Sequence, residues 1–123
     1  MEFRNDKAIY LQIADYVYDK VISKDWQPGE RIPSVREISA LLEVNVNTAM
    51  RTYTALQDAD IVVNKRGVGF FLTENCYQRS FELRKNEFVS QVLPLVLDNM
   101  LTLGITIAEL SELYTKHIEN KKK

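Results

Sequence analysis

The sequence predicts an α+β fold in which three helices precede a β-hairpin and two further helices follow. Three observations support this prediction. Apolar residues recur at helical spacing over residues 8–23. A serine and an asparagine suited to capping open two short helices after residue 33. A glycine-containing turn joins two β-branched or aromatic runs over residues 61–73, which is typical of a hairpin.

The first helix is predicted over residues 8–23, where one stripe contains Ile9, Ile13, Tyr16, Val17 and Val21. The stretch WQPGERIP ends this helix, because Pro28-Gly29 is a turn signal and Pro33 restricts Ile32 to extended geometry. Residues 30–32 therefore predict only a very short strand.

Two helices joined by a tight turn are predicted next. Ser34 is followed by Glu37, which forms a capping box and opens a helix from about residue 35 to 42. Asn45 is a good N-cap for a third helix that runs to about residue 59. On that helix an apolar stripe holds Ala49, Tyr53 and Leu56, and the opposite face holds Asn47, Arg51, Thr54 and Asp58, with Thr48 and Met50 at its flanks.

From Cys76 onward the pattern is helical again. Pro94 predicts a kink, and Gly104 suits the end of the first of two helices. Thr106 with Glu109 forms a second capping box that opens the last helix. The segment FVSQVLPLVL is apolar on nearly every side, so it needs a cover on two faces.

Composition excludes several classes of protein. The formal net charge of −1 argues against a sequence-independent nucleic-acid coat, although a DNA-binding face depends on where the charges lie. Cys76 is the only cysteine and His117 the only histidine. The chain therefore has too few suitable side chains for an enzyme active site, a disulfide or a metal site, and no cofactor is expected.

The sequence also lacks targeting and membrane signals. The first ten residues have no signal-peptide core, and the longest apolar run is far short of the ~20 residues of a membrane helix. We therefore expect a cytoplasmic protein without a membrane partner.

The predicted order of helix, short strand, helix, turn, helix and hairpin is that of a winged helix-turn-helix (HTH). Three stretches, AIYLQIADYV, WQPGERIPSVREISALLEVNVNTAMRTYTALQDADIV and NKRGVGFFL, closely resemble the GntR family of bacterial transcription regulators over about residues 8–73. The remainder is too short for the ligand-binding domains of most members and is similar to the small YtrA subfamily.

This resemblance implies a DNA-binding domain over residues 1–75 and a two-helix dimerisation region over residues 76–123. It implies that helix 45–59 enters the major groove and that the wing, residues 61–73, approaches the DNA backbone or the minor groove. The DNA-binding residues predicted in this way are Ser34, Arg36, Asn45, Asn47, Thr48, Arg51, Lys65, Arg66 and Gly67. The predicted dimer interface consists of Phe88, Val92, Leu95, Val96, Met100, Leu110 and Tyr114.

The residues of the third helix support this interpretation independently. No acidic residue lies between Val44 and Gln57, and Arg51 is the only charge there. Asparagine can pair bidentately with adenine and arginine with guanine. Structural roles compete with these functions: Asn45 serves as a helix cap, Arg36 could pair with Glu37 or Glu43, and the Lys65-Arg66 pair could simply solubilise a hairpin.

Three positions depart from the family pattern. Val46 stands where arginine or proline is frequent, and it either meets a thymine methyl group or packs. Glu43 and Asp60 replace turn glycines, so both are expected to adopt positive φ.

The leading functional prediction is a sequence-specific repressor that binds a pseudo-palindromic double-stranded operator as a homodimer. The alternative is a winged-helix protein-interaction module without specific DNA binding. Repression versus activation, and a small-molecule effector of unidentified chemistry, stay open.

Overall fold

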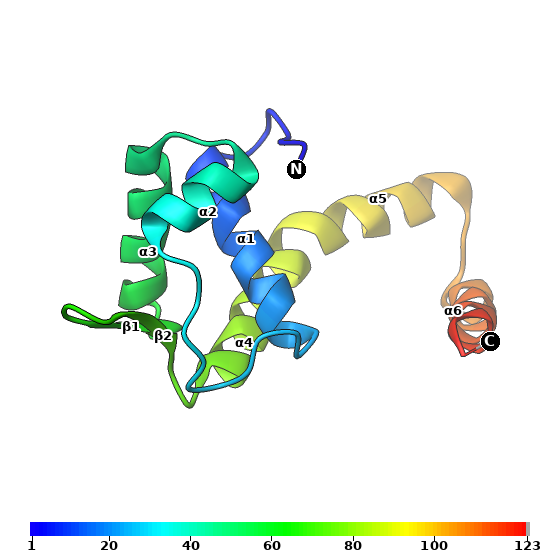
Figure 1. The fold of residues 1–123 in the computed structure, drawn as a ribbon. Helices are drawn as coiled ribbons and strands as arrows, with labels where there is room; N and C mark the ends of the chain where they lie inside the picture. The colour runs from blue at the N-terminus through cyan, green and yellow to red at the C-terminus, as the bar shows by residue number, and fades with distance from the viewer. Residues whose placement is uncertain (123) are drawn as a thin grey trace. The chain divides into compact units, whose positions relative to one another are not determined.

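The computed structural model describes residues 1–122, and the chain divides into two compact units, with the boundary between Lys85 and Asn86. The first unit contains α1 (Ile9–Ile22), α2 (Val35–Leu42), α3 (Val46–Asp58), β1 (Val62–Lys65) and β2 (Gly69–Leu72), followed by most of α4 (Cys76–Glu87) (Figure 1). This order confirms the predicted winged HTH fold.

The hairpin forms the wing of the fold. β1 pairs with β2 in antiparallel register, with Val62 opposite Leu72 and Lys65 opposite Gly69. The very short strand predicted over residues 30–32 is reduced to a single bridge between Arg31 and Phe71. This bridge connects the wing to the segment that leads into α2.

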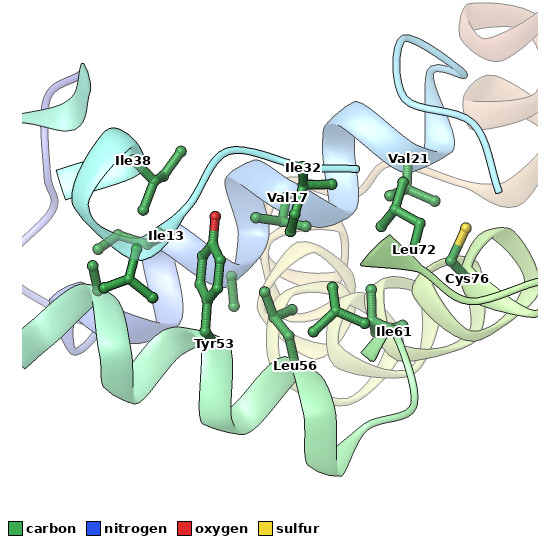
Figure 2. Close-up of a cluster of buried hydrophobic side chains, with 14 of the residues drawn as sticks. Ile13, Val17, Val21, Ile32, Ile38, Tyr53, Leu56, Ile61, Leu72 and Cys76 are labelled. Carbon is green, nitrogen blue, oxygen red and sulfur yellow. The ribbon is translucent and has the colours of Figure 1, made fainter. Parts of the chain in front are cut away.

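The core of the first unit lies between α1, α2, α3 and the hairpin, and Cys76 of α4 closes one end of it (Figure 2). From α3 the buried side chains are Ala49, Thr52, Tyr53 and Leu56. Ile9 was predicted to share the buried stripe of α1 but is 46% exposed, because it is the first residue of the helix and lies at the end of the packed stripe.

Two hydrogen bonds fix α3 against its neighbours. The Thr52 hydroxyl donates to the Tyr10 carbonyl oxygen (2.7 Å), and the Tyr53 hydroxyl donates to the carbonyl oxygen of Pro33. Burial raises the pKa of Tyr53, which keeps its phenol protonated as a donor. The ring of Tyr53 also meets Phe70 of the wing edge-on, with 4.9 Å between centroids. The orientation of α3 is thereby tied to α1, to the start of α2 and to the wing.

The turns contain non-glycine residues in the left-handed region. Glu43 has φ 55° and Asp60 has φ 61°, as their replacement of turn glycines predicted. Lys24, at φ 66°, shares this geometry, and no sequence signal pointed to it. Such a backbone costs a residue with a Cβ of order 1 kcal/mol.

The second unit contains η1 (Phe88–Val92), a π-helical turn, followed by α5 (Leu93–Leu103) and α6 (Ile107–Lys121). The disturbance predicted at Pro94 takes the form of this π-turn, because proline has no N–H and its ring clashes with the carbonyl four residues earlier. Gly104 ends α5 at φ 68°. The Thr106 hydroxyl then caps α6 by accepting from the Glu109 N–H (3.2 Å).

Most apolar side chains of the second unit are exposed. Among the predicted interface residues, exposed fractions are 50% for Phe88, 43% for Val92, 64% for Leu95, 40% for Val96, 38% for Leu110 and 66% for Tyr114, whereas Met100 is buried. Within residues 1–122, no individual helix has both the length and the apolar character to cross a membrane. Only Cys76–Leu103 and α6 taken together, with a sharp bend at the break between them, pass that test by length and composition.

Candidate nucleic-acid interface

The start of α2 is held by the predicted capping box. The Ser34 hydroxyl accepts from the Glu37 N–H, and the Ser34 N–H donates to the Glu37 carboxylate, both at 3.1 Å. These bonds from Ser34 lower the pKa of Glu37 below its ordinary value. Arg36 is exposed and forms no ion pair with the residues that the structure describes, so neither Glu37 nor Glu43 engages its guanidinium.

The start of α3 confirms the capping role of Asn45, whose side-chain oxygen accepts from the Asn47 N–H (2.7 Å). The side chain of Asn47 is exposed, and Thr48 is half-buried. Val46 and Met50, four residues apart and therefore neighbours on the helix surface, are 41% and 48% exposed. Val46 thus leaves a large part of its apolar surface open on the same helix as Asn47.

Arg51 lies over the ring of Tyr10, with 3.9 Å between the guanidinium carbon and the ring centroid. Tyr10 belongs to the first turn of α1. Arg51 is exposed and has no acidic partner among residues 1–122. Arg51 is among the predicted DNA-binding residues and Tyr10 is not, because nothing in the spacing of two residues on different helices indicates such a contact.

The wing tip is a turn closed by a hydrogen bond from the Val68 N–H to the Lys65 carbonyl oxygen (2.9 Å). Gly67 has φ 78° in this turn, a conformation that favours glycine. The Lys65 ammonium lies 4.4 Å from the Phe71 ring centroid. Arg66 is exposed and has no ion-pair partner within the described part of the chain.

Arg31, in the segment that leads into α2, contacts the wing and is a cation that the sequence pattern did not indicate. Its Nε donates to the Val68 carbonyl oxygen (3.2 Å), and its side chain lies so close to Gly69 that a Cβ there would come within 2.7 Å of Nε. The signal for this contact was Gly69 itself, because a glycine within a strand often marks a close approach of another group.

These residues come from adjoining elements. α3 packs against α2 and against β1, and Figure 1 shows it between α2 and the wing. The exposed side of α3 carries no carboxylate until Asp58, at its last residue. Arginine and lysine side chains therefore lie at the start of α2, along α3 and at the wing tip, although the chain as a whole has a formal net charge of −1.

Residues 9–72 match the sequence profile of the bacterial regulatory proteins of the gntR family. The match covers more than half of the chain. The chain belongs to the GntR family. This membership confirms the resemblance found in the sequence, and the family is one of transcription regulators.

Two relatives of this GntR chain are HTH-type regulators of Bacillus subtilis. The HTH-type transcriptional regulator YhcF of Bacillus subtilis is 36% identical, over 90% of each chain. The HTH-type transcriptional repressor YtrA of the same organism is 28% identical, over 77% of this chain and 73% of YtrA. A solved GntR-family regulator from Bacteroides thetaiotaomicron superposes with a TM-score of 0.78 at 38% identity, over 93% of this chain and 99% of that one.

Proposed function

We propose that this GntR-family regulator binds a pseudo-palindromic DNA operator as a homodimer and represses transcription. The observation that supports the proposal most is the exposed face of α3, which carries asparagine, arginine and apolar side chains and no carboxylate before its last residue. A solvated helix surface normally carries glutamate and lysine, whereas the second helix of an HTH contacts base edges with its N-terminal residues.

In this proposal three exposed side chains of α3 have base partners of matching chemistry. Asn47 pairs with adenine, Arg51 with guanine, and Val46 with the methyl group of thymine, which the 41% exposure of this apolar side chain favours. Asn45 caps the helix and Thr48 adds a polar contact to a base or a phosphate. The exposed N–H groups at the start of α3 add an anion-binding site for the backbone.

The wing and the start of α2 supply phosphate contacts. Lys65, Arg66 and the backbone at Gly67 approach the DNA backbone or the minor groove, and Ser34 and Arg36 contact the backbone beside the major groove. Such contacts fix the register of the protein on the duplex and contribute affinity that depends on salt, while the bases determine specificity.

Dimerisation is proposed through the second unit. Its exposed apolar side chains, among them Leu95 and Tyr114, need a cover that a second copy of the chain supplies. Residues 1–75 would then bind DNA and residues 76–123 would hold two copies together. Met100, the seventh of the predicted interface residues, is buried within the chain and offers little surface to a second copy. A two-fold axis places two α3 helices on half-sites about one helical turn apart.

Repression is the direction we propose, because the similar protein YtrA bears the name of a repressor. The location follows from the function, since a bacterial regulator meets its operator in the cytoplasm.

The test begins with a selection of duplexes from a random library by the purified full-length protein. Fluorescence anisotropy then compares the selected duplex with a scrambled one at several salt concentrations. Specific binding about 10³-fold tighter than to the scrambled duplex is expected, with an enriched sequence that has two-fold symmetry. Failure to enrich any sequence would overturn the proposal and favour a protein-docking module.

The variant Arg51→Ala sharpens this test. It should lose about 1–3 kcal/mol of binding free energy on the selected duplex and relax selectivity at one position of each half-site. Lys85→Ala is the matched control, because it also removes one exposed cation but lies on α4, outside the proposed interface. Urea unfolding of both variants should match the wild type.

A further inference from the structure

We infer that Tyr10 is a positioning residue for base recognition by Arg51. Its ring holds the guanidinium in the orientation in which the N–H groups of Arg51 pair with guanine. The inference rests on the proposed function, since it assigns a role in DNA recognition to a residue outside the helix-turn-helix. Its basis is the observed contact, 3.9 Å between the Arg51 guanidinium carbon and the Tyr10 ring centroid.

The backbone of Tyr10 is held against α3 by a neighbouring hydrogen bond. Thr52, the residue after Arg51, is fully buried and donates its hydroxyl to the Tyr10 carbonyl oxygen at 2.7 Å. The backbone of Tyr10 is therefore attached to the turn of α3 that carries Arg51. Tyr10 itself is half-buried, so one part of its ring packs while another part is available to the guanidinium.

The contact leaves the chemistry of base recognition available. A guanidinium that lies over an aromatic ring uses its flat face, whereas bidentate pairing with the O6 and N7 atoms of guanine uses N–H groups in its plane. A carboxylate partner would compete for those same N–H groups. Arg51 has no such partner among residues 1–122, so the ring restrains it without occupying its donors.

The consequence for binding is preorganisation. A long, exposed arginine has many rotamers and loses most of this freedom when it pairs with a base. A ring that already restricts the guanidinium removes part of that loss before the DNA arrives. The ring also adds a cation–π attraction that strengthens when the groove excludes water. Both effects act only through Arg51, which makes the role separable from a structural one.

The experiment compares Tyr10→Leu with Tyr10→Phe in the full-length protein, on the duplex selected by the wild type. Leucine removes the aromatic face, and phenylalanine keeps it. We expect Tyr10→Leu to lose about two- to fivefold in affinity per half-site, the range of an exposed cation–π contact, and Tyr10→Phe to stay close to wild type. Tyr16→Leu is the matched control, because Tyr16 lies on the same helix, is also half-buried and meets Trp26 edge-on instead of an α3 side chain.

A double-mutant cycle provides the decisive readout. In the Arg51→Ala background, Tyr10→Leu should have no further effect on affinity. The affinity loss caused by Tyr10→Leu alone should also vanish on a duplex in which the guanine assigned to Arg51 is replaced. Equal losses with and without Arg51 would overturn the inference, as would a Tyr10→Leu protein with wild-type affinity. In both cases the wild type still discriminates the selected duplex, so the proposed function survives. A wild type that selects no duplex refutes the proposed function and the inference with it.

Discussion

The wing tip offers the sharpest quantitative prediction of the proposed interface. Arg66→Ala removes an exposed cation without an ion-pair partner in the described residues, next to a glycine turn that places the tip away from the core. Lys65 is a less clean choice, because its ammonium already lies 4.4 Å from the Phe71 ring centroid. If Arg66 contacts a phosphate, its removal should weaken binding to all duplexes alike.

The magnitude follows from counterion release. Each phosphate contact on B-DNA contributes about −0.9 to the slope of log K against log salt concentration. A homodimer has two wings, so Arg66→Ala removes two contacts and should make the slope less steep by about 1.8. Between 50 and 200 mM salt, this difference in slope changes the ratio of wild-type to variant affinity roughly tenfold. The affinity deficit of the variant should therefore be roughly tenfold larger at 50 mM than at 200 mM salt.

The assay is fluorescence anisotropy of the wild type and of Arg66→Ala on the selected and the scrambled duplex, at four or more salt concentrations. Lys85→Ala, which removes the same charge from α4, should give the wild-type slope. Parallel lines for the wild type and Arg66→Ala would refute the reasoning, because Arg66 would then make no phosphate contact. A loss confined to the selected duplex would also refute it and would assign Arg66 to base recognition.

Four further variants test the fold and the interface. Leu95→Asp, at a side chain 64% exposed, should leave folding intact but give monomers in light scattering that bind the selected duplex weakly; a dimer with full activity would contradict the proposed surface. Tyr53→Phe should lower the free energy of unfolding in urea by about 1–3 kcal/mol, because the Pro33 carbonyl loses its donor. Glu43→Gly should raise that free energy by up to about 1 kcal/mol, since it removes a Cβ at φ 55°, and no gain would show that the turn is unstrained. Val46→Ala should bind equally well to the selected duplex with thymine or with deoxyuridine at the contacted position, whereas the wild type should prefer the thymine duplex by up to a few fold.

The parts of the fold that local chemistry determines could be predicted from the sequence. Ser34 and Asn45 cap helices because a short polar side chain satisfies free N–H groups two or three residues on, which needs no tertiary information. The positive φ at Glu43 and Asp60 follows from the same local requirement of a helix end. The buried stripe of α3 follows from the helical period.

The parts that depend on contacts between elements could not be predicted. The contacts of Arg51 with Tyr10 and of Arg31 with the wing join residues that are distant in the chain. The sequence pattern around each residue is local and therefore does not indicate these contacts. Pro94 indicated a disturbance of the helix, but a kink and a π-turn relieve the same clash, and the sequence does not choose between them. The predicted base, phosphate and dimer contacts involve molecules outside the chain and stay predictions.

Three successive residues of α3 connect the fold to the proposed recognition of bases. Because consecutive helical side chains point about 100° apart, Arg51 faces outward while Thr52 and Tyr53 face the core. Thr52 holds the backbone of Tyr10, and Tyr53 holds the carbonyl that precedes the cap of α2. The two hydrogen bonds therefore set the angle at which α3 presents Arg51, relative both to the Tyr10 ring beneath it and to the start of α2, where we propose phosphate contacts. A core substitution at Tyr53 should consequently weaken binding to the selected duplex more than to the scrambled one, since only base contacts require that angle to be exact.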